Sequence, residues 1–325
     1  MIYQKDTAID MMNQWGSGRI PFLFVIDFEM KAIRLCRTDQ SLPDGVLFDF
    51  SNSAKLPTHG AMATNIEFRK YPVAKNMYKK AFDEVLRQIY AGNSFLVNLT
   101  FPTRIETNIT LREIYDRCHA RYKLILGDEL VVFSPETFVT IIDGVISSCP
   151  MKGTIDANIP DAGKKILNNP KESAEHHTIV DLIRNDLSRV ASEVEVKRFR
   201  YIDKISTNQG NLLQVSSEIS GKLPLGYQAS IGSILFDLLP AGSVTGAPKK
   251  KTLDIIRNVE IAERGYYTGI CGYFDGFSLN SGVMIRFIEN KNGEFWFRSG
   301  GGITCNSDWN SEYNELIQKV YVPIV

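Results

Sequence analysis

The sequence contains many short segments rich in β-branched and aromatic residues, and several of them follow one another across tight turns. In TFVTIIDGVISSCPM (137–151), two apolar runs flank the turn dipeptide Asp143–Gly144. Near the carboxyl end, the segments 266–277, 281–289 and 294–303 are separated only by SLN and NKNG. Consecutive hairpins of this kind favour an α+β fold with mostly antiparallel sheets over a doubly wound parallel sheet.

Other segments carry the periodicity of amphipathic helices. From Met77, apolar pairs recur every four residues as far as Tyr90, and the pattern stops at Gly92–Asn93. Thr110 precedes another helix and is followed three residues later by Glu113, which is a capping-box pattern. Further helices are predicted at 171–191, 227–239, 247–260 and 311–321. No repeat or low-complexity linker divides the chain, so we expect a single domain, 1–325, with a long surface loop at 51–68.

Charge and apolar composition exclude several classes of protein. Lys plus Arg and Asp plus Glu both total 37, so no global positive field attracts nucleic acid or anionic lipid. No apolar run reaches the roughly 18 residues of a membrane span. The first residues also lack the pattern of a secretory signal. We therefore expect neither nucleic acid nor a membrane as a partner.

Cysteine and histidine usage bears on the compartment and on metal binding. The cysteines are odd in number, and none are in Cys-x-x-Cys spacing, which is typical of free thiols in a reducing cytoplasm. With four histidines in the chain, a multi-histidine metal site is disfavoured, and we expect carboxylates to hold any metal.

Two predicted helices carry acidic residues that suit a hard cation. Glu175 lies in the helix 171–191, and Glu312 and Glu315 share one face of the last helix. Taken separately, each set is ordinary for a solvated helix face. If the two helices converge, Glu175 and Glu315 are placed as ligands of a magnesium ion that keeps open positions for substrate.

Glu136 and Lys152 flank the hairpin 137–151. A hairpin goes out and back, so it returns Lys152 to the neighbourhood of Glu136. For most lysines a solvated surface position is the expected environment. At one sheet edge, however, an acid and an amine form either a salt bridge or an acid and nucleophile pair.

Two glycine-rich segments are candidates for anion binding. PAGSVTGAPKKKT (240–252) lacks the spacing of a phosphate-binding P-loop, but Thr245 and Lys249 can present a hydroxyl and a cation at a helix start. FRSGGGITCNSD (297–308) is either a plain glycine loop or a nest of backbone N–H groups around Gly300, Gly301 and Gly302.

The order of these motifs resembles the chorismate-utilising enzymes, a family that includes anthranilate synthase component I, aminodeoxychorismate synthase component I and the isochorismate and salicylate synthases. The resemblance covers about 92–319, through SPETF, PMKGT, ESAEHHTIVDLIRNDLSRVA, PAGSVTGAPKKKTLDII, GYFDG, MIRF, RSGGGITCNSD and SEYNELIQK. Residues 1–90 match loosely, as a shortened N-terminal part of the same domain. The resemblance implies two large antiparallel sheets packed as a sandwich with flanking helices.

The resemblance also implies the site. Glu175 and Glu315 would hold Mg²⁺, which binds the ring carboxylate of chorismate, and Glu136 would protonate the departing 4-hydroxyl group. The enolpyruvyl carboxylate would be bound by Arg286 and Tyr273 and by the amides of Gly300, Gly301 and Gly302. Thr245 and Lys249 would line the same cavity.

Lys152 separates the branches of this family. Anthranilate and isochorismate synthases typically have alanine at this place, whereas aminodeoxychorismate synthases resemble this chain and have lysine. In that branch the free amine of the lysine attacks ring C2, and ammonia then adds at C4. Isochorismate synthases use a lysine base where this chain has Leu96. Aminating members usually have glutamine there, and many members have histidine in place of Gln214.

The resemblance thus implies aminodeoxychorismate synthase component I, which converts chorismate and ammonia to 4-amino-4-deoxychorismate on the route to 4-aminobenzoate and folate. The sequence shows no cysteine motif of a glutaminase, so ammonia would come from a separate glutaminase subunit or from solution. Anthranilate synthase component I is the alternative enzyme. A non-catalytic chorismate-binding protein is the alternative from another class.

Overall fold

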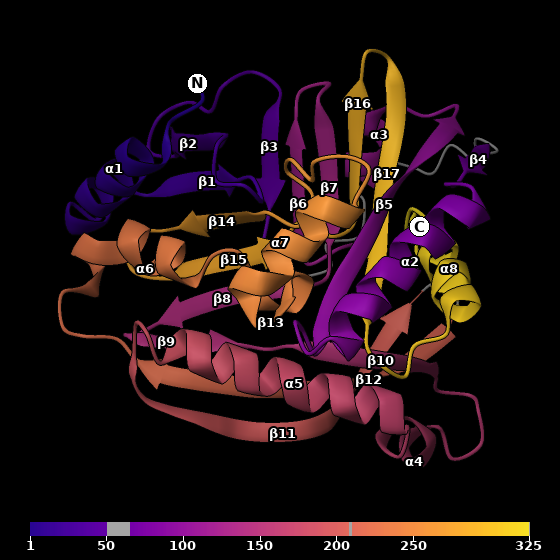
Figure 1. The fold of residues 1–325 in the computed structure, drawn as a ribbon. Helices are drawn as coiled ribbons and strands as arrows, with labels where there is room; N and C mark the ends of the chain where they lie inside the picture. The colour runs from indigo at the N-terminus through magenta and orange to yellow at the C-terminus, as the bar shows by residue number, and fades with distance from the viewer. Residues whose placement is uncertain (51–65, 208–209, 325) are drawn as a thin grey trace.

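The computed structural model describes residues 1–50, 66–207 and 210–324, and it contains two large antiparallel sheets with helices packed on their outer faces (Figure 1). This arrangement confirms the predicted fold class. Most of the surface loop predicted at 51–68 lies outside the described residues.

The first sheet crosses the lower and left parts of Figure 1 and is antiparallel throughout. In spatial order it contains β10 (Met151–Asp156), β12 (Gly210–Lys222), β9 (Val145–Ser148), β8 (Thr137–Ile142), β15 (Leu279–Val283), β14 (Ile270–Phe274), β1 (Phe22–Ile26) and β2 (Ile33–Arg37), with β11 (Ser192–Thr207) paired to β12.

The second sheet stands beside the first and is also antiparallel. Its strands are β13 (Gly246–Ala247), β5 (Leu96–Thr107), β17 (Glu294–Ile303), β16 (Phe287–Lys291), β7 (Leu130–Ser134), β6 (Tyr122–Leu126) and β3 (Val46–Asp49), with β4 (Phe68–Tyr71) paired to β5. The helices of the described residues are α1 (Lys5–Ser17), α2 (Lys75–Tyr90), α3 (Leu111–Arg117), α4 (Ala162–Leu167), α5 (Pro170–Leu187), α6 (Ile231–Leu238), α7 (Lys249–Val259) and α8 (Trp309–Gln318), with 3₁₀ turns η1 (Tyr227–Ser230) and η2 (Gly242–Val244).

The core lies on both faces of the first sheet, because side chains of a strand alternate between faces. Leu23 and Val25 of β1 pack with Val132 of the second sheet, so they lie between the sheets. Phe22 and Phe24 point to the other face and join the apolar cluster that includes residues of α1, α5 and α6. Helices α2, α7 and α8 cover β5 in the same way.

The hairpin that links Glu136 to Lys152 forms as predicted. Strands β8 and β9 pair in register around Asp143 and Gly144. Both turn residues have positive φ, 50° and 76°, which is the backbone of a type I′ turn and matches the twist of the strands. The capping box at Thr110 and Glu113 is also present at the start of α3.

The predicted strand 281–289 is wrong in one respect, because the chain changes sheets in its middle. Strand β15 ends at Val283 in the first sheet and β16 begins at Phe287 in the second. The segment between them carries Arg286, whose carbonyl accepts from the Phe133 amide of β7 at 2.8 Å and whose side chain lines the space where the two sheets meet.

Candidate active site

A cavity of about 480 Å³ lies where the two sheets meet. Strands β10, β12 and β17, helices α5 and α8, and the turn η2 contribute residues to its wall. The charged side chains that line it are Glu136, Lys152, Glu172, Glu175, Arg286, Glu312, Glu315 and Lys319. A cavity with acids and cations on its walls suits a ligand that is anionic and is accompanied by a metal cation.

Lys152 occupies a mostly buried position in this cavity. It pairs with Val215 across β10 and β12, and the register shifts at the bulge before Thr154, where Gly153 has a φ of +75°. The Lys152 side chain is 20% exposed, and its Nζ lies 3.6 Å from Oε2 of Glu175. Lys152 is therefore not a solvated surface lysine, and its amine faces the predicted metal ligand.

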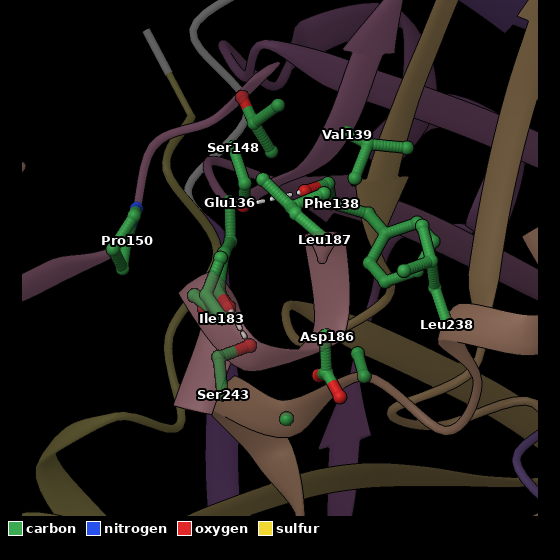
Figure 2. Close-up of a pocket in the computed structure, with 13 residues that line it drawn as sticks. Glu136, Phe138, Val139, Ser148, Pro150, Ile183, Asp186, Leu187, Leu238 and Ser243 are labelled. Carbon is green, nitrogen blue, oxygen red and sulfur yellow. Dashed lines mark hydrogen bonds between the residues drawn. The ribbon is translucent and has the colours of Figure 1, made fainter. Parts of the chain in front are cut away.

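Glu136 is the residue immediately before β8, and it lines the same cavity. The Ser243 hydroxyl donates a hydrogen bond of 2.5 Å to its Oε1 (Figure 2). Burial raises the pKa of the Glu136 carboxyl, while the Ser243 hydrogen bond and the nearby cations Lys152 and Arg286 oppose that rise. A raised pKa keeps the protonated form available at higher pH, as a general acid requires.

Acids of α5 and α8 line one cavity, which meets the condition stated for a magnesium site. Glu172, Glu175, Glu312 and Glu315 all line the cavity. In the described part of the chain, no three acidic, histidine or cysteine side chains are already gathered as a closed metal cage. Magnesium is commonly held by one or two carboxylates and keeps water or substrate on its other positions, so this donor set fits Mg²⁺.

The glycine segment leaves space beside these acids. A Cβ atom on Gly302 would lie 3.2 Å from Oε2 of Glu175, and one on Gly301 would lie 3.3 Å from Oε2 of Glu312 and 3.9 Å from Oε1 of Glu315. Side chains at these two positions would therefore crowd the carboxylates, on the Glu175 side of the segment at Gly302 and on the α8 side at Gly301.

The structure corrects the expected conformation of this segment. Gly300, Gly301 and Gly302 form neither a loop nor a nest but part of β17, which pairs with β5. The amides of Thr100 and Asn98 bond away from β17, to Glu260 and to the Thr245 carbonyl, so their partners Gly300 and Gly302 are in non-hydrogen-bonded pairs. These two glycines therefore direct their N–H groups to the opposite edge of β17.

That edge of β17 is open to the cavity. Strand β16 pairs with β17 only as far as Arg298, so the next residues have no strand beside them on this side. Lys319 donates to the Gly300 carbonyl at 2.8 Å and pairs with Glu315 at 2.7 Å. The edge can thus present amide donors to a carboxylate, although its geometry is that of a strand.

Arg286 faces the same space. Its guanidinium lies 5.3 Å from the ring centre of Tyr321, and both side chains line the cavity. Among the described carboxylates, none forms an ion pair with Arg286. A partly buried guanidinium in this position can bind a carboxylate through two parallel hydrogen bonds.

Three residues predicted to contact the substrate do not line this cavity. Tyr273 lies in β14, and its ring packs 5.3 Å from that of Phe48. Thr245 is fully buried and donates to the Ala241 carbonyl at 2.7 Å. Lys249 pairs with Asp186 at 2.6 Å and so links α7 to α5.

Lys249 and Asp186 are a buried structural pair. The ammonium also donates to the Leu238 carbonyl at 2.8 Å. Burial lowers the pKa of Lys249 and raises that of Asp186, and the contact between the two opposes both shifts. Lys249 and Thr245 therefore hold the loop between α6 and α7, in place of the anion-binding role expected from the sequence.

Several residues of the cavity wall are not predicted by the sequence motifs. Lys319 lies four residues after Glu315, a spacing that places both on one helix face and could have indicated it. Tyr267 lines the cavity and Tyr273 does not, and burial raises the pKa of Tyr267 to about 12, so its hydroxyl stays protonated. Asn98 and Ser243 carried no signal of their own in the sequence.

Comparison with known proteins decides the family. A model of the chorismate binding enzyme family matches residues 33–324. The chain belongs to this family. An uncharacterized PabA-like protein of Haemophilus influenzae is 49% identical over 316 residues, which are 97% of this chain and 96% of the relative.

Relatives with named activities are more distant. Aminodeoxychorismate synthase component 1 of Bacillus subtilis is 31% identical over 77% of this chain and 55% of its own length. Anthranilate synthase component 1 of Acetivibrio thermocellus is 32% identical over 82% of this chain and 56% of its own. The chain thus spans about half the length of each of these two enzymes.

Solved structures of this family share the fold. The menaquinone-specific isochorismate synthase of Escherichia coli superimposes with a TM-score of 0.74 over 98% of this chain and 82% of its own, at 16% identity.

Two further observations concern membrane-spanning helices and cysteine thiols. The described residues include no helix long and apolar enough to span a membrane. All five cysteines are free thiols.

Proposed function

We propose that this protein is an aminodeoxychorismate synthase component I, which uses chorismate, ammonia and Mg²⁺. The observation that supports this proposal most is the position of Lys152, whose amine faces the cavity that also holds Glu136 and Glu175. The comparisons support chorismate as the substrate at the level of the family. They leave the reaction open, since relatives named for C4 and for C2 amination are similarly distant.

In the proposed reaction, the neutral amine of Lys152 attacks ring C2 of chorismate with its lone pair. Both conjugated double bonds of the ring shift, and the 4-hydroxyl group leaves as water with the proton of Glu136. Ammonia then adds at C4, both double bonds shift back, and the Lys152 amine leaves C2 with its electron pair. The surplus proton of the new ammonium group returns to the Glu136 carboxylate.

The remaining residues bind the two carboxylates of the substrate. Mg²⁺ held by Glu175 and Glu315 would neutralise the ring carboxylate. Arg286 and the amides on the open edge of β17 are placed for the enolpyruvyl carboxylate, and the Tyr267 hydroxyl is a neutral donor nearby. Leu96 has no basic group, so it cannot activate water for the isochorismate reaction. We further propose that ammonia is supplied by a separate glutaminase subunit or taken from solution.

The proposal is tested by analysing products. Purified protein is incubated with chorismate, Mg²⁺ and an ammonium salt, and the products are separated by chromatography. Aminodeoxychorismate is the expected product, and it should not form without ammonium. Anthranilate would instead identify an anthranilate synthase. Binding of chorismate with no product under any condition would indicate a non-catalytic chorismate-binding protein.

Arg286→Lys should reduce kcat/KM strongly. Lysine keeps the charge but cannot make two parallel contacts with a carboxylate. We expect a loss on the order of 2 kcal/mol or more, which is at least about thirtyfold. Arg257→Lys, an exposed position on α7, is the matched control and should keep the wild-type value. An unchanged kcat/KM for Arg286→Lys would exclude the carboxylate contact.

A further inference from the structure

The loop between α6 and α7, residues 239–248, reaches the cavity wall through Ser243. Its hydroxyl points at the carboxyl of Glu136 (Figure 2). Both residues line the large cavity and also a second cavity of about 20 Å³, which reaches Asp186 of α5. The hydrogen bond therefore fixes one oxygen of the Glu136 carboxyl in the wall between the two cavities.

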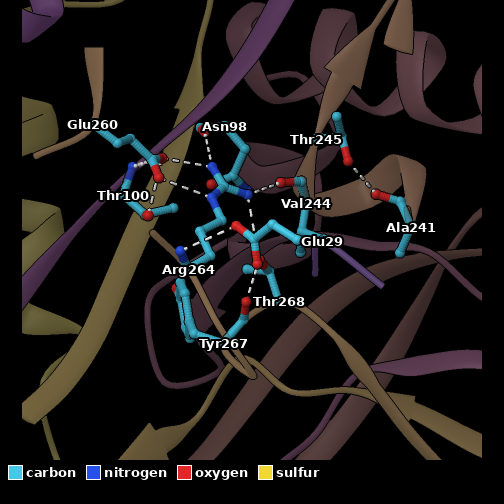
Figure 3. A network of polar contacts seen from close by, with 10 residues as sticks. All are labelled: Glu29, Asn98, Thr100, Ala241, Val244, Thr245, Glu260, Arg264, Tyr267 and Thr268. Carbon is cyan, nitrogen blue, oxygen red and sulfur yellow. Dashed lines mark hydrogen bonds and ion pairs between the residues drawn. The ribbon is translucent and has the colours of Figure 1, made fainter. Parts of the chain in front are cut away.

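A buried arginine anchors this loop. Arg264 is 1% exposed, and its guanidinium donates to the carbonyl oxygens of Val244 and Asn98, each at 2.7 Å (Figure 3). Val244 directly follows Ser243, and Val244 and Asn98 both line the large cavity. Arg264 thus holds two backbone segments of the cavity wall, one from the loop and one from β5, in a fixed relation.

The charge of Arg264 is balanced within the same cluster. Glu260 accepts from Nε at 2.9 Å and from Nη2 at 2.6 Å, and it also accepts from the Thr100 amide of β5. The remaining guanidinium proton is directed to the Thr268 hydroxyl at 3.3 Å. Every N–H of the guanidinium therefore has an acceptor, which makes a rigid buried anchor rather than an unpaired charge.

We propose that Ser243 is a positioning residue for the Glu136 carboxyl, and that the buried Arg264–Glu260 pair holds the loop from which Ser243 acts. The inference rests on the proposed function only where it calls Glu136 the general acid. The contact joins two side chains of the protein itself, so it can be tested without turnover.

The direction of the effect follows from the donor. A hydroxyl that donates to a carboxyl oxygen favours the ionised form, so loss of the Ser243 hydroxyl should raise the pKa of Glu136 further. The cations facing this carboxyl are Lys152 of β10, Arg286 between the sheets and Lys319 at the end of α8. All three remain when Ser243 is changed, so the change isolates one hydrogen bond.

The test is a ¹³C NMR titration of ligand-free protein labelled at the glutamate carboxyl carbon. The Glu136 signal is the one missing from Glu136→Gln. In Ser243→Ala its midpoint should rise by about one pH unit, the scale of a hydrogen bond to a charged group. Ser243→Thr keeps the hydroxyl and should titrate as wild type, since the small cavity beside it has room for a methyl group. An unchanged midpoint in Ser243→Ala would overturn the proposal.

Arg264 is tested by the same signal. Arg264→Lys keeps the charge but loses the planar guanidinium that contacts both Val244 and Asn98. The midpoint of the Glu136 titration should therefore move in the same direction as in Ser243→Ala. Arg257→Lys on the neighbouring helix is the control and should leave it unchanged. If Arg264→Lys does not fold by circular dichroism, Glu260→Gln loosens the same anchor. A folded variant of either kind with the wild-type midpoint would contradict the anchoring part of the proposal.

Turnover separates this inference from the proposed function. If Glu136 is the general acid, activity falls as pH rises through its pKa, and in Ser243→Ala that fall should move to higher pH with the NMR midpoint. If the NMR midpoint moves and the pH profile does not, the positioning role stands and the general-acid role of Glu136 fails.

Discussion

Lys152→Ala should lose amination at C4 while chorismate still binds. The substitution removes the amine that is proposed to open the route at C2. It leaves Glu136, Arg286 and the acids of α5 and α8, which line the same cavity and are proposed to recognise the substrate. We expect the rate of aminodeoxychorismate formation to fall on the order of a thousandfold or more. Direct attack of ammonia at C2, which gives anthranilate-type products, should become relatively more competitive because that face of the ring is now open.

Two controls separate the nucleophile from the charge. Lys152→Arg retains a cation beside Glu175 but has no nucleophilic amine at neutral pH, so it should be as inactive as Lys152→Ala. Lys164→Ala removes a lysine that is 83% exposed on α4 and should behave as wild type. Mass spectrometry of wild-type protein with chorismate and without ammonium should trap an adduct on the Lys152 peptide. Wild-type aminodeoxychorismate formation by Lys152→Ala would exclude both a nucleophilic and a basic role.

The positions of Glu136 and Lys152 could be predicted because they depend on local structure. The turn residues Asp143 and Gly144 fix a two-residue hairpin, and a hairpin determines which residues meet at its open end. The pairing of Glu312 and Glu315 on one face of α8 is likewise a matter of helix geometry. In each case the interacting residues lie within one element or two adjacent ones.

The role of Lys249 could not be predicted because its partner is distant in sequence. A lysine at a helix start suits an anionic ligand and an internal carboxylate equally well. The tertiary fold brings the start of α7 to α5, where Asp186 lies 2.6 Å from the Lys249 ammonium and holds it away from the cavity. The Thr245 hydroxyl is turned away for a related reason, since it satisfies a carbonyl of its own loop.

Arg286 shows a second limit of sequence patterns. Four of the five residues at 283–287 are apolar, so their pattern is compatible with one continuous strand. Periodicity does not reveal that the chain passes from one sheet to the other there. The three glycines of β17 are predicted as a loop or a nest because glycine is rare inside strands, yet they pair with β5 as part of a strand. Here the missing side chains leave space beside Glu175 and Glu312.

Glu175→Gln should weaken Mg²⁺ and chorismate binding together. The cavity wall formed by α5 and α8 carries four acids, and Lys152 and Lys319 balance only part of their charge. Without a divalent cation this wall should therefore repel an anionic substrate. The amide has the shape of the carboxylate but only one oxygen and no charge, which makes it a poor ligand for a hard cation. Wild-type protein should gain thermal stability on adding Mg²⁺ and more on adding chorismate, since ligands that bind the folded state stabilise it. Glu175→Gln should lose most of both shifts, and Glu315→Gln should act alike.

Asp181→Asn provides the control on the same helix, because Asp181 is 72% exposed and pairs only with Arg184 among the contacts of the described residues. Its response to Mg²⁺ and chorismate should equal that of wild type. Titration calorimetry with chorismate, in the presence of Mg²⁺ or of a chelator, measures the coupling directly. In wild type the chelator should weaken chorismate binding strongly, and in Glu175→Gln it should make little further difference. If Glu175→Gln instead bound chorismate normally and kept its full response to Mg²⁺, the cation would not be held by Glu175, and the acids of α5 and α8 would need another role.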